Sequence, residues 1–145
     1  MSGRLSLTEL VEELQQRVEF QEVPREFDED DYMSMVKYGV KHLFIDTGRE
    51  SIYSEDLFIS ERGMEYFDME LTITEIEYIL VLAQIRFFGI VRTSVNAMVS
   101  YTTDALSVTQ GDKPYANISG SIRELEDERH RLFYKMVDYV NYEGS

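Results

Sequence analysis

Apolar residues recur at the intervals of a helix near the start of the chain. The repeat consists of Leu7, Leu10, Val11, Leu14 and Val18. Ser6 precedes Glu9 by three residues, which is the spacing of a capping box at a helix N-terminus. The pattern therefore predicts a first helix over residues 7–18. Pro24 prevents its continuation, because proline cannot donate a backbone hydrogen bond.

A second amphipathic segment follows an acidic run at residues 28–31. Consecutive acids suit the start of a helix, where the helix dipole favours negative charge. The apolar positions that form one face are Tyr32, Met35, Val36, Val40, Leu43 and Phe44. We expect this helix to end near Asp46, with Gly48 as its stop. Residues 49–70 have no clean period and are expected to form one short helix and an extended loop.

The longest apolar pattern begins after Leu71. Thr72 and Thr74 each precede a glutamate by three residues, and a helix can then continue to about Tyr101. Roughly 28 residues at 1.5 Å each give a length of about 42 Å. Apolar residues surround this helix on nearly every side. We therefore expect the rest of the chain to cover part of it and neighbouring subunits to cover the remainder.

The last part of the chain reads as a polar turn and a second long helix. Residues 107–117 (SVTQGDKPYAN) favour an extended polar loop or a short β segment near residues 105–116. A charged amphipathic helix follows, capped by Asn117 or Ser119. The predicted fold class is mainly α, a helical bundle with a long central helix, this loop and a C-terminal helix. Residues 1–145 are expected to form a single domain, with an acidic N-terminal segment at 1–31 and a possible interaction segment at 138–145.

Composition removes several classes of function. The chain has no cysteine, which excludes disulfides, thiolate metal sites and cysteine nucleophiles. Its net charge of −14 repels phosphate and opposes a domain that grips nucleic acid, and residues 1–31 hold about half of the excess. The strongest uncharged apolar run, Tyr78–Ile85, is far shorter than the roughly 20 residues that cross a bilayer. With no signal-peptide pattern at the N-terminus either, we expect a soluble protein without a membrane partner.

Patterns typical of catalysis or metal binding are weak. Asp127 and His130 share a helix face, as in the metal sites of helical bundles, but no second pair of this kind accompanies His42. The sequence Gly111-Asp112-Lys113 lacks the upstream glycine and the following serine or threonine of a phosphate loop. No nucleophile elbow is present. We therefore expect no enzyme, no cofactor and no metal.

Tyrosines are concentrated in the C-terminal half, at Tyr101, Tyr115, Tyr134, Tyr139 and Tyr142. A tyrosine has an apolar ring and a polar tip, which suits protein interfaces and also ordinary cores. The acidic segment at residues 1–31 has two readings as well, either a solvated surface or a docking surface for a basic partner.

Three stretches of the C-terminal half form a recognisable combination. They are LTITE at 71–75, which opens the long helix, SVTQGD at 107–112 in the turn, and YKMV at 134–137 in the closing helix. Over residues 71–142 this combination resembles the head-to-tail connector proteins of tailed bacteriophages, also called adaptor or head-completion proteins. The resemblance covers about half of the chain.

The resemblance implies a structural virion protein that forms a ring, typically dodecameric, between portal and tail. Such a subunit is made in the host cytoplasm and lies in the neck of the virion, where the ring lines the DNA channel without sequence-specific binding. Its partners are other copies of itself, the portal protein, and tail or stopper proteins, and a C-terminal segment engages the portal. The interaction residues expected in this chain are Val108, Gln110, Asp112, Tyr115, Tyr134, Tyr139 and Tyr142.

An acidic regulatory or inhibitory protein that mimics DNA and binds a basic partner is the alternative. A DNA mimic carries carboxylates in regularly spaced exposed rows. In this chain half of the excess negative charge precedes Tyr32, and the later helices carry both signs.

Overall fold

The computed structural model describes residues 3–21, 23, 26–102 and 117–144, and at 96–102 and 138–144 it describes the helical backbone alone. The helices are α1 (Leu7–Val18), α2 (Glu29–Asp46), α3 (Ile73–Thr102) and α5 (Ile118–Gly144). The described residues also form two short 3₁₀ helices, η1 (Glu50–Ile52) and η2 (Glu55–Leu57). They form three strands as well, β1 (Leu5–Ser6), β2 (Phe58–Glu61) and β3 (Met64–Phe67). The prediction of a mainly α fold is confirmed. The loop or β segment predicted near 105–116 lies outside the described residues.

The helix boundaries follow from capping chemistry. The Ser6 side chain accepts a hydrogen bond from the Glu9 amide, and Asp28 and Asp31 form a reciprocal capping box at the start of α2. Gly48, with φ of +73°, lets the chain leave α2. Of the two capping boxes proposed for the long helix, the structure contains the one between Thr72 and Glu75.

Residues 49–70 differ from their predicted short helix and extended loop. They form η1, η2 and a β-hairpin in which Glu61 lies opposite Met64. Arg62 and Gly63 between them have positive φ angles of 54° and 79°, as in a type I′ turn, which suits the twist of a two-residue hairpin. β1 pairs with the other edge of β3, so the sheet is antiparallel with the order β1-β3-β2. This pairing joins distant parts of the chain, and no local pattern announces it.

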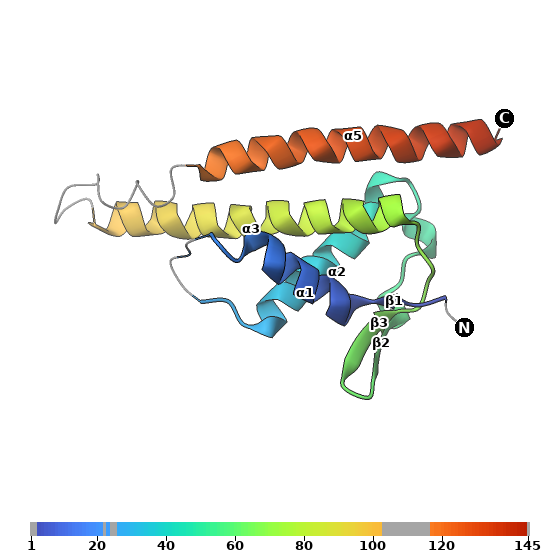
Figure 1. Ribbon diagram of the computed structural model, residues 1–145, viewed down its shortest axis with the longest axis horizontal. Coiled ribbons are helices and arrows are strands. Elements are labelled where there is room, and N and C mark those ends of the chain that lie inside the picture. Colours follow the sequence, from blue (N-terminus) through green and yellow to red (C-terminus); the bar gives the residue numbers. More distant parts are fainter. Residues whose placement is uncertain (1–2, 22, 24–25, 103–116, 145) are drawn as a thin grey trace.

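Helix α3 forms the centre of the fold (Figure 1). α1 and α2 pack against its N-terminal half, and α5 runs antiparallel along it. All residues from Tyr78 to Ala83 are buried, so this part of α3 is covered on every side. The rest of the chain thus covers part of α3, whereas Ile73 is 86% exposed and Ile76, Ile85 and Ile90 are partly exposed. That neighbouring subunits cover this remainder stays a prediction.

A glycine brings α2 close to α3. A Cβ atom at Gly39 would lie 2.6 Å from the backbone oxygen of Ile79, closer than real Cβ atoms approach. The backbones of the two helices therefore meet at this point, and any larger residue would separate them.

One stretch of α3, Ile73–Val95, is long and apolar enough by length and composition to cross a membrane, with a mean hydropathy of 1.4. More than half of its most apolar part, 56%, is buried inside the fold. A core helix meets the same criterion, and α1, α2 and α5 all pack against α3. We therefore read the apolar character of α3 as that of a core helix.

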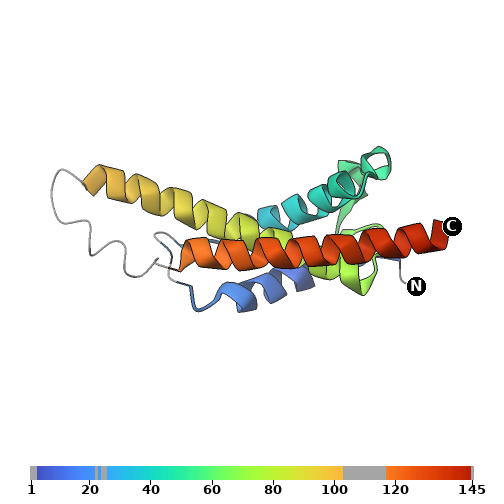
Figure 2. The same cartoon turned by 90° about the horizontal axis from the view of Figure 1, so that it is seen from above.

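The long helices extend beyond the rest of the molecule. In Figure 1 the C-terminal part of α3 passes beyond α1 and α2 at one end, and the C-terminal part of α5 passes beyond the start of α3 at the other. α1 and α2 both lie on the face of α3 away from α5 (Figure 1), where they contact each other and diverge to either side of the α3–α5 pair in Figure 2. The molecule therefore has two separated ends and two different flanks.

Candidate interaction surface

The structure describes part of the predicted interaction set. Tyr134 lies on α5, and its side chain is 62% exposed. Tyr139 and Tyr142 also lie within α5, where only the backbone is described. The remaining residues of the set lie outside the described residues, and they are Val108, Gln110, Asp112 and Tyr115.

Tyr134 borders a groove where α5 packs over α2 and α3. The groove has a volume of about 460 Å³. Its lining consists of Asp46 from α2, Tyr78 from α3, and Glu126, Arg129, His130, Phe133 and Tyr134 from α5. We call this the α5 groove. It joins the helices that form the long pair to the end of α2.

Three side chains form a polar cluster at the floor of the α5 groove. The hydroxyl of Tyr78 donates a hydrogen bond of 2.7 Å to Oδ2 of Asp46. Nη2 of Arg129 donates to the same oxygen at 2.9 Å, and Nε of Arg129 donates to the Tyr78 hydroxyl at 3.3 Å. Nη1 of Arg129 also reaches Glu126 at 3.4 Å. The cluster thus connects α2, α3 and α5 through directional contacts.

The environment fixes the protonation states of this cluster. Burial, assisted by the Asp46 carboxylate, raises the pKa of Tyr78 to about 12. Burial alone lowers the pKa of Arg129, but its hydrogen bonds to Tyr78 and Asp46 outweigh burial and raise that pKa. At neutral pH the phenol is therefore protonated and the guanidinium is charged. This arrangement holds α2, α3 and α5 together.

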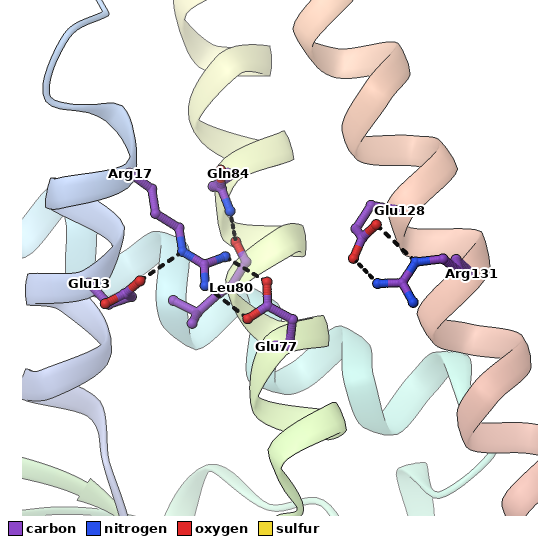
Figure 3. Close-up of polar contacts among 7 residues, drawn as sticks. All are labelled: Glu13, Arg17, Glu77, Leu80, Gln84, Glu128 and Arg131. Carbon is purple, nitrogen blue, oxygen red and sulfur yellow. Dashed lines mark hydrogen bonds and ion pairs between the residues drawn. The ribbon is translucent and has the colours of Figure 1, made fainter.

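A second polar contact joins α3 to α1 (Figure 3). Arg17 donates two hydrogen bonds of 2.8 Å to the two carboxylate oxygens of Glu77, and its Nε donates to Glu13 at 3.0 Å. On α5, Glu128 and Arg131 pair with each other. Glu77 and Tyr78 are consecutive residues of α3. One turn of α3 therefore contacts α1 through Glu77, and it contacts both α2 and α5 through Tyr78.

Exposed apolar side chains lie on elements that meet near the α5 groove. They are Ile45 at 39% exposure, Ile52 at 49%, Ile73 at 86% and Tyr134 at 62%. Nη2 of Arg49, next to η1, donates to Glu75 of α3 at 2.6 Å and so ties these elements together. Figure 1 shows the end of α2, the start of α3 and the second half of α5 at the same end of the molecule. We call these four residues the apolar end.

The two histidines occupy surface or partly packed positions. His130 borders the α5 groove and is exposed, as is Asp127. The ring of His42 lies 4.2 Å from that of Tyr38, and burial lowers its pKa. Within the described ranges, no three His, Asp or Glu side chains are grouped so that they could hold a metal ion.

Sequence reasoning missed the polar cluster. Asp46 was expected only as a helix end, and Arg129 falls among many charged residues of α5. Tyr78 gave the usable signal, because a phenol inside an apolar helix needs a hydrogen-bond partner. The partner itself comes from other helices, so periodicity along α3 does not identify it.

Comparison of the chain with protein-family models, with curated proteins and with solved structures found no match. The functional argument therefore rests on the residues and the fold.

Proposed function

We propose that the protein is a ring-forming connector subunit in the neck of a tailed bacteriophage, where it joins portal to tail around the DNA channel. One observation carries the proposal: the ends of the α3–α5 pair extend beyond the rest of the molecule in opposite directions (Figure 1). The 30 residues of α3 span about 45 Å. A subunit of this shape presents separate ends to two assemblies and its flanks to other copies.

The apolar end supports a role in assembly. Single exposed apolar residues are ordinary, but several on elements that meet at one end are typical of protein contacts. In the proposal, Tyr134 and residues 138–145 contact the portal from this end. Val108, Gln110, Asp112 and Tyr115, which lie outside the described residues, contact tail or stopper proteins in the same proposal.

The charge of the chain suits a channel. A subunit with a net charge of −14 repels the phosphates of DNA, so a ring of such subunits lets the duplex pass without holding it. The same charge opposes a role in which this protein grips DNA.

The mass of the purified full chain in solution, with negative-stain images, tests the proposal. We expect a closed ring with a central hole, either for the chain alone or after addition of purified portal. A stable monomer or dimer under both conditions would refute the connector function.

Removal of residues 138–145 tests the docking part separately. We expect the shortened chain to form rings but to lose attachment to purified portal. Unchanged attachment would refute the role of this segment and leave the ring untouched.

A second candidate is an acidic inhibitor that mimics DNA. The exposed face of α1 favours it, because Glu9, Glu12 and Glu19 form no ion pair with any residue in the described part of the chain. The exposed cations Lys41 and Arg86 elsewhere on the surface oppose it. A monomer or dimer that displaces DNA from a basic protein would favour the inhibitor over the connector.

A further inference from the structure

The α1 flank of the molecule carries an acidic stripe. Its exposed residues follow one another at helical spacing and are Glu9, Glu12, Gln16, Glu19 and, just after the helix, Phe20. We call this stripe the acidic flank. Phe20 is 93% exposed, the highest value among the large apolar side chains described. The acidic flank therefore offers a row of carboxylates and one aromatic ring to a partner.

The α2 flank carries the opposite charge. Its cations are Lys37 and Lys41 of α2 and Arg86 of α3, and we call these residues, together with the rings of Tyr38 and His42, the basic flank. The Arg86 guanidinium carbon lies 5.2 Å from the centre of the Tyr38 ring, and the His42 ring lies 4.2 Å from that of Tyr38 at an angle of 34°. Lys37 pairs with Glu65 at 3.1 Å. Lys41 and Arg86 are exposed, and neither pairs with a carboxylate in the described ranges.

Helix dipoles do not account for the basic flank. The last turn of α2 contains no basic residue, and Arg86 lies in the middle of α3, so none of these cations gains from a helix dipole. A groove of about 360 Å³ adjoins these cations. The rings of Tyr38, Tyr53 and Phe58 line it together with Ser34, Lys37, Lys41 and one carboxylate, that of Glu55. The basic flank therefore combines positive charge with an apolar recess, in a chain whose net charge is −14.

We propose that the acidic flank of one copy docks on the basic flank of the next copy, with Phe20 in the aromatic groove. Charge complementarity indicates a second copy of this chain as the partner, because the carboxylates of one flank can pair with the cations of the other. The two flanks are different surfaces, one on α1 and the other on α2 and the middle of α3, so the contact is heterologous and its repetition can close a ring. The inference rests on the proposed function and names the contact between neighbouring subunits of the ring.

Charge reversal tests the contact on the full chain. One variant carries Lys41→Glu and Arg86→Glu, so that both flanks are acidic. A second variant carries Glu12→Lys and Glu19→Lys, so that both flanks are basic. Each variant alone is expected to lose the ring in native mass spectrometry and sedimentation, with a fall in apparent association of at least tenfold.

Rescue separates a broken contact from a misfolded chain. Mixing the two variants pairs an acidic with a basic flank at every contact, and we expect rings that contain both variants in equal number. A single chain that carries all four substitutions should also form rings. Phe20→Ser should weaken assembly without lowering the melting temperature, because the side chain is almost fully exposed in the single chain.

A matched control reverses two exposed cations of α5. Arg123→Glu and Lys135→Glu change the net charge by the same amount as the first variant, but they lie outside both flanks. Rings of normal size are expected from this control. If the wild-type chain forms rings that all the flank variants also form, the contact is refuted and the connector function stands. If the wild-type chain forms no ring, alone or on portal, both proposals fail.

Discussion

Helices α3 and α5 lie side by side and have nearly equal lengths, 30 and 27 residues, but they join the fold by different means. α3 is buried on all sides from Tyr78 to Ala83 and is buried again at Phe87 and Phe88. In the described part of α5, the buried residues are Ile118, Leu132 and Met136. Besides these apolar contacts, the polar cluster of Asp46, Tyr78 and Arg129 attaches α5 to the fold.

The difference shows how one helix can support a fold while its neighbour presents a surface. Apolar burial is non-directional and scales with the buried area. The apolar surface of α3 therefore stabilises each helix that packs against it. The cluster around Arg129 depends on geometry, so it fixes where α5 lies along α2 and α3. α5 can therefore expose Tyr134 and much of its charged face without loss of the core.

Two phenylalanines test this comparison with the largest expected effect. Phe87 of α3 is 1% exposed, whereas Phe133 of α5 is half-buried at the edge of the core. We expect Phe87→Ala to lower the free energy of unfolding by about 4 kcal/mol, because it leaves a cavity among packed rings. Phe133→Ala should cost about 2 kcal/mol or less. Urea unfolding followed by circular dichroism measures both.

Equal losses in the two variants would break the comparison, because they would show that α5 contributes to the core as strongly as α3. An unchanged slope of the urea transition in both variants is needed for the two values to be compared.

The sequence predicted the helices well because each carries its own signals. Ser6, Asp28 and Thr72 mark the starts of α1, α2 and α3, and the apolar repeats follow them. The hairpin at 58–67 was missed because its strands are four residues long and its third partner, β1, comes from the far end of the chain. Local periodicity contains no information about such a partner.

The candidate surface was less predictable than the fold. Tyr134 was identified from its residue type alone, and the structure places it beside the α5 groove. Asp46 and Arg129 were not identified, because their contact joins residues 83 positions apart. The basic flank also needed the fold, since Arg86 of α3 meets Tyr38 of α2 only when the two helices pack together.

Two arginines of α5 test the same comparison with a smaller expected change in the free energy of unfolding. Arg129 pairs with Asp46, whose side chain is 18% exposed, and its loss leaves that carboxylate with the Tyr78 hydroxyl as its partner. We expect Arg129→Met to lower the free energy of unfolding by about 2 kcal/mol. Hydrogen exchange should become faster in α5 and remain unchanged in α1.

Arg131 is the matched control for Arg129. It pairs with Glu128 on the same helix, and its side chain is 60% exposed. Arg131→Met should leave both the stability and the exchange of α5 unchanged, because exposed pairs within one helix contribute little. An equal effect of the two substitutions would mean that general charge on α5, and not the cluster with Asp46, holds the helix.

Alkaline pH gives the finest test of the cluster. Tyr78 has a pKa of about 12 in the folded chain, against about 10 for an unfolded tyrosine. Because the folded pKa is the higher one, the stabilisation is complete below pH 10 and is lost as the pH rises toward 12. The loss at pH 11 is about 1.4 kcal/mol.

Tyr78→Phe isolates this contribution, since burial also raises the pKa of Tyr32 and Tyr53. The variant should lose less stability than the wild type between pH 10 and pH 11, in urea titrations at each pH. Absorbance of tyrosinate at 295 nm should show one phenol fewer titrating near pH 12. If the two proteins lose stability in parallel, the Tyr78 hydroxyl does not connect α3 to α2 and α5, and apolar contacts alone hold α5 to the fold.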